Sequence, residues 1–300
     1  MKKKTYLFAL MAMALTLGSC SDNENGIGSE TSKYITVSTS IDNMTRVATD
    51  AKGGQTFEEG DEISVYVWTG APTVAPETSE RVVNNAINKL TNGTWVSTPQ
   101  MLWKNNREKH YFIGVYPIAA ISDLTAGEYT FDVTKQTESD LLVAVNPDGL
   151  SYRADAQQIV PLTFTHVMSK LAVNLTYKNQ WGGIPTVEKV VVGNAAKEAT
   201  INYLTKVVTP STTAKEDFSL PEITENTKYV SVIIPQEEVK QLTIVIGGKN
   251  FVYDNGTPFK LESGKITTVN LEVGRDEIKL GDVKITDWED GSTFSGEAIN

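Results

Sequence analysis

The chain has 300 residues, a formal net charge of −10, one cysteine and two histidines. The acidic balance argues against nucleic-acid binding, which needs a basic surface, and a single cysteine excludes a disulfide bond within the chain. Without residues 1–19, which resemble a removable segment, 300 − 19 = 281 residues remain, enough for two domains of ordinary size.

The N-terminus has the three parts of a secretory signal. Lys2 to Lys4 precede an apolar run from Tyr6 to Leu17, and the small residues Gly18 and Ser19 follow. The run is well short of the roughly 20 residues that span a bilayer as a helix. We therefore expect residues 1–19 to be a removed signal peptide, not a buried helix or a membrane anchor.

Cys20 explains why an exported chain carries one cysteine. Leu17-Gly18-Ser19-Cys20 resembles a bacterial lipobox, in which the signal is cut before a cysteine whose thiol carries the lipid. We predict lipidation at Cys20 and anchoring in a membrane, because acyl chains contribute about 0.8 kcal/mol per buried methylene. The acidic residues after Cys20 resemble the surface-export signals of Bacteroidetes lipoproteins, which implies the outer membrane and the cell surface. The polar, acidic and glycine-bearing residues 20–33 are predicted to be a flexible tether.

Short segments with strand character follow in chain order, separated by turn residues. Many alternate apolar and polar residues, the period of a half-buried strand, and they are rich in β-branched and aromatic side chains. We expect strands at 34–41, 61–68, 109–116, 129–133, 141–145, 162–164, 170–177, 187–192, 229–234, 242–246, 266–273 and 283–288.

Turn and helix signals complete the prediction. Asn92-Gly93, Gly247-Gly248 and Asn255-Gly256 are hairpin signals. Short helices are expected only at 79–90 and 195–204. Strands without interleaved long helices indicate sandwiches or barrels. A polar stretch at 155–158 divides the chain into two β domains, 34–157 and 158–300.

No known catalytic or cofactor motif is present. The two histidines lack the neighbours of a zinc site, and the sequence has no serine elbow, phosphate loop or dinucleotide fingerprint. The carboxylates at 58–59 and 61–62 are interpreted as solvated loop acids. The alternative is a glycosidase, which would need two of these carboxylates to face each other across a cleft. Four tryptophans beside strands are interpreted as packing residues rather than a sugar platform: Trp68, Trp95, Trp103 and Trp288. We therefore predict no enzyme activity, metal or cofactor.

The segment 162–175 is distinctive. Its apolar residues change parity around Ser169-Lys170, which indicates a bulge or a strand that bends between sheets. His166 falls on the inward set and is expected to be a hydrogen-bonded core histidine at the domain junction.

The same segment resembles the F-x-H-x-x-(S/A)-K-(L/V) signature of the fimbrillin family of Bacteroidetes. Further stretches agree with that family in order over nearly the whole chain; no single motif is specific, but the ordered set is. They are Phe57 to Val65, Tyr116-Pro117-Ile118, Ser139 to Ala144, Ile233 to Gln236, Ser263-Gly264-Lys265 and Ile285 to Trp288.

The resemblance implies two tandem transthyretin-like β-sandwich domains with few short helices, and a subunit of a type V pilus exported as a lipoprotein. Its partners would be other fimbrial subunits, the outer membrane through the lipid on Cys20, and an arginine-directed protease. In such pili the protease removes an N-terminal strand, and a neighbouring subunit's strand fills the groove.

The matching cleavage site here is Arg46-Val47, between the first strand and Gly53-Gly54; an ordinary loop arginine is the alternative. The donor is left open, because Val283 to Trp288 is either the donated strand or the last strand of the second domain. A different function is also consistent with the sequence: a non-polymerising surface lipoprotein that binds a glycan or a host protein.

Overall fold

A computed structural model describes residues 33–42, 56–74, 76–153, 158–254 and 256–288. These residues form nineteen β-strands and two short 3-10 helices, Thr78–Glu80 and Asn179–Trp181. The all-β prediction with few short helices is confirmed. No helix in the described ranges is long and apolar enough to cross a membrane.

The first half is one seven-stranded sheet in the order β1-β8-β7-β5-β2-β3-β4. It curls so that its two edges meet: the Ile35 N–H donates to the Met101 carbonyl (3.0 Å), and the Trp103 N–H to the Lys33 carbonyl (3.2 Å). The curled sheet encloses its own apolar core, as the two layers of a sandwich would. The strands are β1 Thr36–Ile41, β2 Glu62–Thr69, β3 Val83–Thr91, β4 Thr94–Thr98, β5 His110–Tyr116, β7 Leu142–Leu150 and β8 Ile159–His166.

The second half contains two sheets that share a core. One has the order β13-β10-β16-β17 and the other β14-β15-β9-β18-β19. Inward residues of both sheets, such as Val190 and Ile244 from the first and Val173 and Val269 from the second, belong to one buried cluster. The strands are β9 Ser169–Tyr177, β10 Val187–Ala196, β13 Lys215–Ser219, β14 Glu222–Thr224, β15 Lys228–Ile233, β16 Gln241–Ile246, β17 Lys249–Asp254, β18 Lys265–Val273 and β19 Ile278–Asp287.

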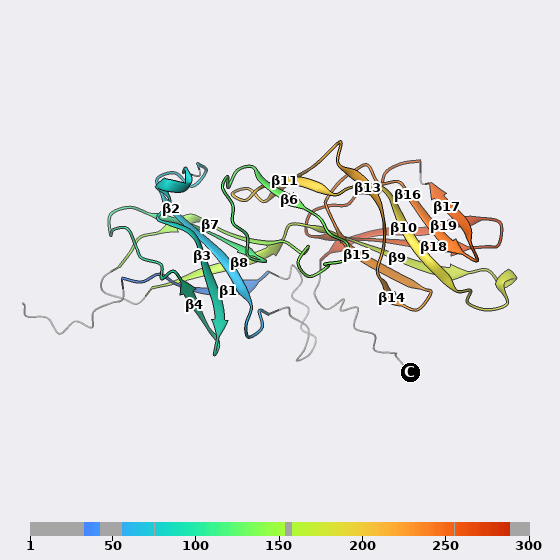
Figure 1. Ribbon diagram of the computed structural model, residues 1–300, viewed down its shortest axis with the longest axis horizontal. Coiled ribbons are helices and arrows are strands. Elements are labelled where there is room, and N and C mark those ends of the chain that lie inside the picture. Colours follow the sequence, from blue (N-terminus) through green and yellow to red (C-terminus); the bar gives the residue numbers. More distant parts are fainter. Residues whose placement is uncertain (1–32, 43–55, 75, 154–157, 255, 289–300) are drawn as a thin grey trace, which may run out of the picture.

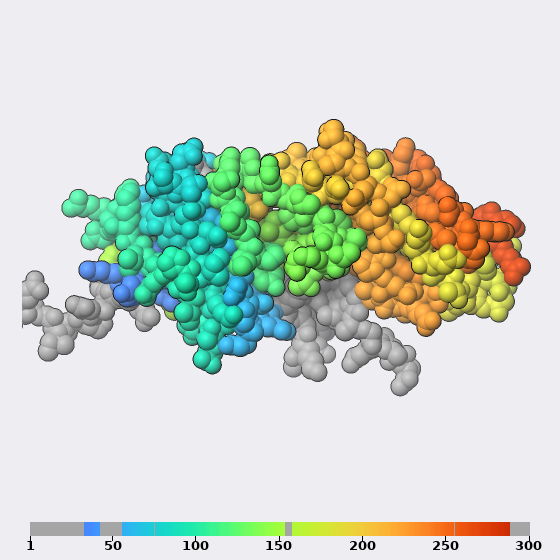
Figure 2. Space-filling model, viewed as in Figure 1, coloured from blue at the N-terminus to red at the C-terminus, as the bar shows by residue number. Residues whose placement is uncertain are grey.

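A small third sheet joins the halves. Its order is β12-β11-β6, so that β6 (Gly127–Thr130) from the first half pairs with β11 (Glu198–Asn202), which also pairs with β12 (Val207–Pro210). The core of the second half continues under this sheet to Tyr66 and Trp68 of β2. The molecule is therefore one continuous elongated body, with residues 121–141 lying at its centre (Figures 1 and 2).

The predicted domain boundary at 157/158 is wrong. β8 pairs with both β1 and β7 of the first sheet, so the chain passes between the halves at Val167-Met168. The polar stretch at 155–158 lies in the connection between β7 and β8, which are antiparallel neighbours. The boundary was misplaced because a polar connection between two paired strands has the same composition as a polar linker between domains. The predicted bend between sheets at Ser169-Lys170 is confirmed, because β8 and β9 belong to different sheets.

Both predicted helices are mainly strands, and only residues 79–80 of the first lie in a helix, the 3-10 helix Thr78–Glu80. In β3, Asn84 and Asn85 together oppose the single residue Tyr66, and Asn85 has φ 58°. This bulge spaces the inward residues Val83 and Ala86 three apart, which imitates the period of a helix. At 195–204 the chain forms β11, where Ala199 and Ile201 alternate inward with period two.

Two of the three hairpin signals are confirmed. Asn92-Gly93 joins β3 to β4, and Gly247-Gly248 joins β16 to β17, with positive φ at all four residues as a type I′ turn requires. Asn255-Gly256 does not join a hairpin, because β17 and β18 lie in different sheets. Asn255 itself lies outside the described residues.

Candidate functional site

The first strand, β1, lies in a groove of the curled sheet. It runs parallel to β8, with Val37 opposite Val160 and Ile41 opposite Phe164. A second wall is formed by the residues after β4, which hydrogen-bond the entry to β1 through Ile35 and Lys33. β1 is the end strand of the sheet, but contacts from β8 and from the residues after β4 hold it on both sides.

The side chains of β1 face two environments. Ile35 and Val37 are buried in the core of the first half, whereas Ser38 and Ser40 are exposed. Polar contacts hold the rest of the strand: the Trp95 indole N–H donates to the Thr39 hydroxyl (3.0 Å) and the Asp42 N–H to the Phe164 carbonyl (2.8 Å). Alternate apolar side chains and backbone hydrogen bonds thus hold β1 in place.

An open cleft of about 620 Å³ runs along β1. Phe57 lies against it and makes edge-to-face contacts with Trp95 and Phe164, with ring centroids 5.4 and 5.1 Å apart. The side of β1 away from β8 is therefore only partly covered. A strand bound at this place contacts aromatic rings on that side, not a continuous sheet.

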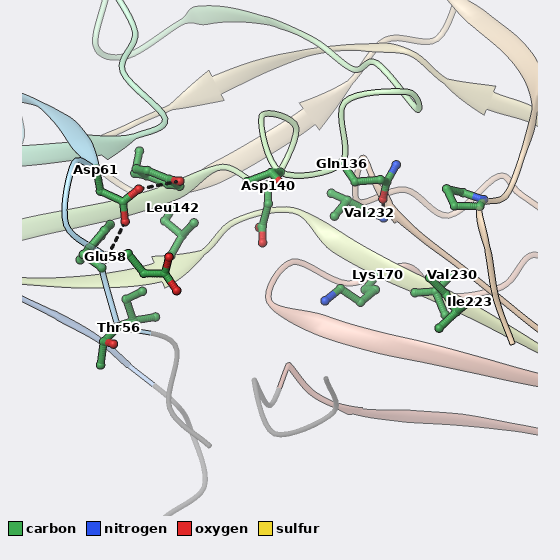
Figure 3. Close-up of a pocket in the computed structure, with 15 residues that line it drawn as sticks. Thr56, Glu58, Asp61, Gln136, Asp140, Leu142, Lys170, Ile223, Val230 and Val232 are labelled. Atoms are coloured by element: carbon green, nitrogen blue, oxygen red, sulfur yellow. Dashed lines mark hydrogen bonds between the residues drawn. The ribbon is translucent and has the colours of Figure 1, made fainter. Parts of the chain in front are cut away.

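A second cleft, of about 520 Å³, lies between the halves (Figure 3). Its first-half wall carries Glu58, Asp61 and Asp140, and Lys170 faces them from the second half. Asp61 accepts a hydrogen bond from the Glu58 N–H (2.7 Å) and lies 3.5 Å from the Tyr116 hydroxyl. Burial and the Asp61 carboxylate raise the pKa of Tyr116. Asp61 thereby helps to order the segment that leads into β2.

The other predicted loop acids also have structural partners. Glu59 accepts from the N–H of Asn92 in the β3–β4 turn (2.7 Å), and Glu62 pairs with Lys89 (3.1 Å). In the described part of the chain, no group of three or more histidine, cysteine, aspartate or glutamate side chains could hold a metal ion.

His166 is the buried junction histidine that the sequence predicts. Its Nδ1 lies 2.8 Å from an Asp140 carboxylate oxygen, and its ring stacks on Trp288 with centroids 4.1 Å apart and planes 8° from parallel. Lys170 Nζ lies 4.1 Å from the centre of the Trp288 ring. The four tryptophans predicted as packing residues are all buried, which confirms that interpretation: Trp68, Trp95, Trp103 and Trp288.

Three predicted site residues lie outside the described residues: Cys20, Arg46 and Val47. The structure does place the two ends of the segment that contains Arg46. Ile41 and Phe57, which lie close to these two ends, each line both of the clefts described above. Two features were missed in the sequence analysis: the second wall of the groove at 101–103 and the contact of Trp288 with His166. Neither gives a sequence signal, because each joins residues far apart in the chain.

Solved structures share this fold. A candidate cell adhesion protein from Bacteroides ovatus matches with a TM-score of 0.62 and 18% identity, over 85% of this chain and 98% of its own. A second, from Bacteroides uniformis, matches with 0.60 and 18%, over 86% and 100%. A fimbrial protein from Bacteroides vulgatus matches with 0.51 and 12%, over 84% and 99%.

No curated protein matches the chain. The model of one protein family, described as fimbrillin-like, matches residues 45–288. That range includes every described strand except β1, and it ends at the residue that stacks on His166. The chain belongs to the fimbrillin-like family.

Proposed function

We propose that this protein is a structural subunit of a type V-like surface fimbrium that assembles by donor-strand exchange. It is exported as a lipoprotein through Cys20 and processed after Arg46. Membership of the fimbrillin-like family makes it a fimbrial, non-enzymatic protein of the cell surface. One observation carries the finer proposal: β1 fills a two-sided groove and is connected to the rest of the fold only through the segment that contains Arg46.

Cleavage after Arg46 would free β1 from the chain. Loss of β1 would remove Ile35 and Val37 from the core and leave β8 as an unpaired edge. Such an edge readily accepts another strand, because it presents unpaired backbone groups and empty apolar positions together. A strand from a neighbouring subunit would restore both. The same cut would separate the body from Cys20 and its lipid, so processing would activate the groove and detach the subunit from its membrane anchor.

The two terminal strands support the view that this form is unassembled. β1 fills its own groove, and β19 pairs with β18 along its whole length. Val283 to Trp288 therefore belongs to the second half of the same subunit in this form. A subunit that keeps β19 permanently would end a fimbrium, whereas one that releases it would have a strand to give.

The test is controlled cleavage of the purified full chain with an arginine-specific protease. The cleaved protein is mixed with a labelled peptide that copies residues 33–42, and binding and size are measured. We expect cleavage at Arg46, followed by peptide binding or by polymerisation that the peptide suppresses. The Arg46→Lys variant keeps the charge but resists the protease, so it should neither bind nor polymerise.

A protein cleaved at Arg46 that stays a folded monomer and ignores the peptide would overturn the proposal. Binding to a glycan or a host protein by that stable monomer would favour the surface-binding lipoprotein instead. A matched peptide with the Val37→Asp change serves as the specificity control, because a carboxylate at the buried position should abolish binding.

A further inference from the structure

The last described residue, Trp288, anchors the end of β19. Only 3% of its surface is exposed, although it follows a strand whose residues are mostly exposed. Its ring stacks on His166, and the Lys170 ammonium lies 4.1 Å from the ring centre. Its backbone N–H donates to the Gly264 carbonyl (3.0 Å). These contacts form a clamp, here called the Trp288 clamp, that consists of Trp288, His166, Lys170 and Asp140.

The clamp is built from both halves of the molecule. His166 ends β8 in the first sheet, and its imidazole is positioned by Asp140, which precedes β7. Lys170 belongs to β9 in the second half. The turn that receives Trp288 is tied to the crossing segment as well, since the Gly264 N–H donates to the Met168 carbonyl (2.8 Å). The end of β19 is thus fixed where the chain passes from one half to the other.

Elsewhere, β19 is the edge strand of its sheet. It pairs with β18 alone, whereas β18 also pairs with β9 and would keep that partner if β19 left. The apolar row of β19 faces the same side as the buried residues of β18, but Leu280, Val283 and Ile285 remain 37–40% exposed. An edge strand with partly exposed apolar contacts opens at a lower free energy than the core strands.

We infer that the Trp288 clamp is a latch that controls the opening of β19. When the indole leaves His166 and Lys170, β19 separates from β18 as a unit while the remaining sheets stay folded. Asp140 acts as a positioning residue, because it touches the imidazole and not the strand. The assembly purpose of the latch rests on the proposed function: the latch would keep the C-terminal strand on its own subunit until assembly begins.

Hydrogen–deuterium exchange of the purified, uncleaved full chain tests the latch. In Trp288→Ala, we expect the amides of β19 to exchange about tenfold faster or more, while those of β10 and β16 keep their wild-type rates. The control is Val283→Ala, which removes a partly exposed side chain from the middle of the same strand and should change the rates far less. Unchanged β19 exchange in Trp288→Ala, or equal acceleration of all strands, would overturn the inference.

Asp140→Ala gives an independent readout and serves if Trp288→Ala does not fold. We expect it to accelerate β19 exchange although it does not contact β19, and to add nothing in the Trp288→Ala background. Additive effects would refute the positioning role. The uncleaved monomer needs neither an open groove nor a partner, so failure here and failure of peptide binding after cleavage are separate outcomes.

Discussion

The indole N–H of Trp95 donates a 3.0 Å hydrogen bond to the hydroxyl of Thr39, and this bond joins β4 to β1 across the two ends of the first sheet. A sheet that curls until its ends approach each other covers part of its edge, which makes pairing with other chains less favourable. Because β1 is one of the two ends, a single strand closes the sheet. The protection therefore depends on the strand that the proposed cleavage would remove.

Val37 should supply much of the apolar contact that holds β1. Val37→Ala removes two buried methyl groups and leaves a small cavity, so we expect the free energy of unfolding of the uncleaved protein to fall by about 2 kcal/mol. Ser38→Ala, at the exposed neighbour, is the control and should lie within about 0.5 kcal/mol of the wild type. Urea unfolding measures both. Equal effects of the two substitutions would show that β1 is not held by its inward side chains.

Gln136 links the halves through its side-chain amide. Its oxygen accepts from the Val232 N–H (2.7 Å), and its nitrogen donates to the Ser231 hydroxyl (3.1 Å). Gln136→Ala leaves the Val232 N–H without this partner, and we expect a loss of about 1–3 kcal/mol in unfolding free energy. Glu138→Ala, in the same loop but exposed, should cost under about 1 kcal/mol. A loss for Gln136→Ala no larger than that of the control would contradict a structural role at the junction.

Gly114 in β5 is needed because an aromatic ring occupies the space beside it. A Cβ at this position would lie 2.6 Å from the ring of Phe164, which is itself fixed by its contact with Phe57. Gly114→Ala should therefore destabilise the protein by about 1–3 kcal/mol through overpacking. Phe164→Leu should relieve the clash, so the double variant should lose less than the sum of the single losses in thermal or urea unfolding. Strict additivity would show that the ring is not what excludes the side chain.

Local patterns predicted most strands, but not how the halves connect. Period-two alternation located β1 and β2, and Asn92-Gly93 predicted its hairpin. The bulge at Asn85 changed that period within β3, and a window of sequence cannot distinguish a bulged strand from a short helix. The boundary was misplaced because β8 pairs with β1, more than a hundred residues earlier. Pairings of that range leave no trace in composition.

In the candidate site, too, the sequence predicted local features but not contacts between residues far apart in the chain. The sequence predicted a buried, hydrogen-bonded His166 from its parity, and the contact with Asp140 confirms it. It could not predict Trp288 on the imidazole, because that contact depends on where β19 ends. Cleavage at Arg46 and lipidation at Cys20 stay predictions, since both residues lie outside the described ranges.

The final prediction concerns acid stability and His110. This imidazole is fully buried in β5, and its Nε2 accepts from the Lys104 N–H (3.1 Å), which requires the neutral ring. Burial lowers the pKa of His110 below its ordinary value of 6.5. Below pH 6.5, the unfolded chain therefore binds a proton at His110 more readily than the folded protein does. The stabilising contribution of His110 is complete above that pH and is lost as pH falls.

His110→Gln keeps an acceptor but does not titrate. Urea unfolding from pH 7.5 to 5 should show the wild type losing more stability than this variant, and the difference isolates His110 because all other titrating groups are shared. A wild-type-minus-variant difference that stays constant with pH would contradict the assignment.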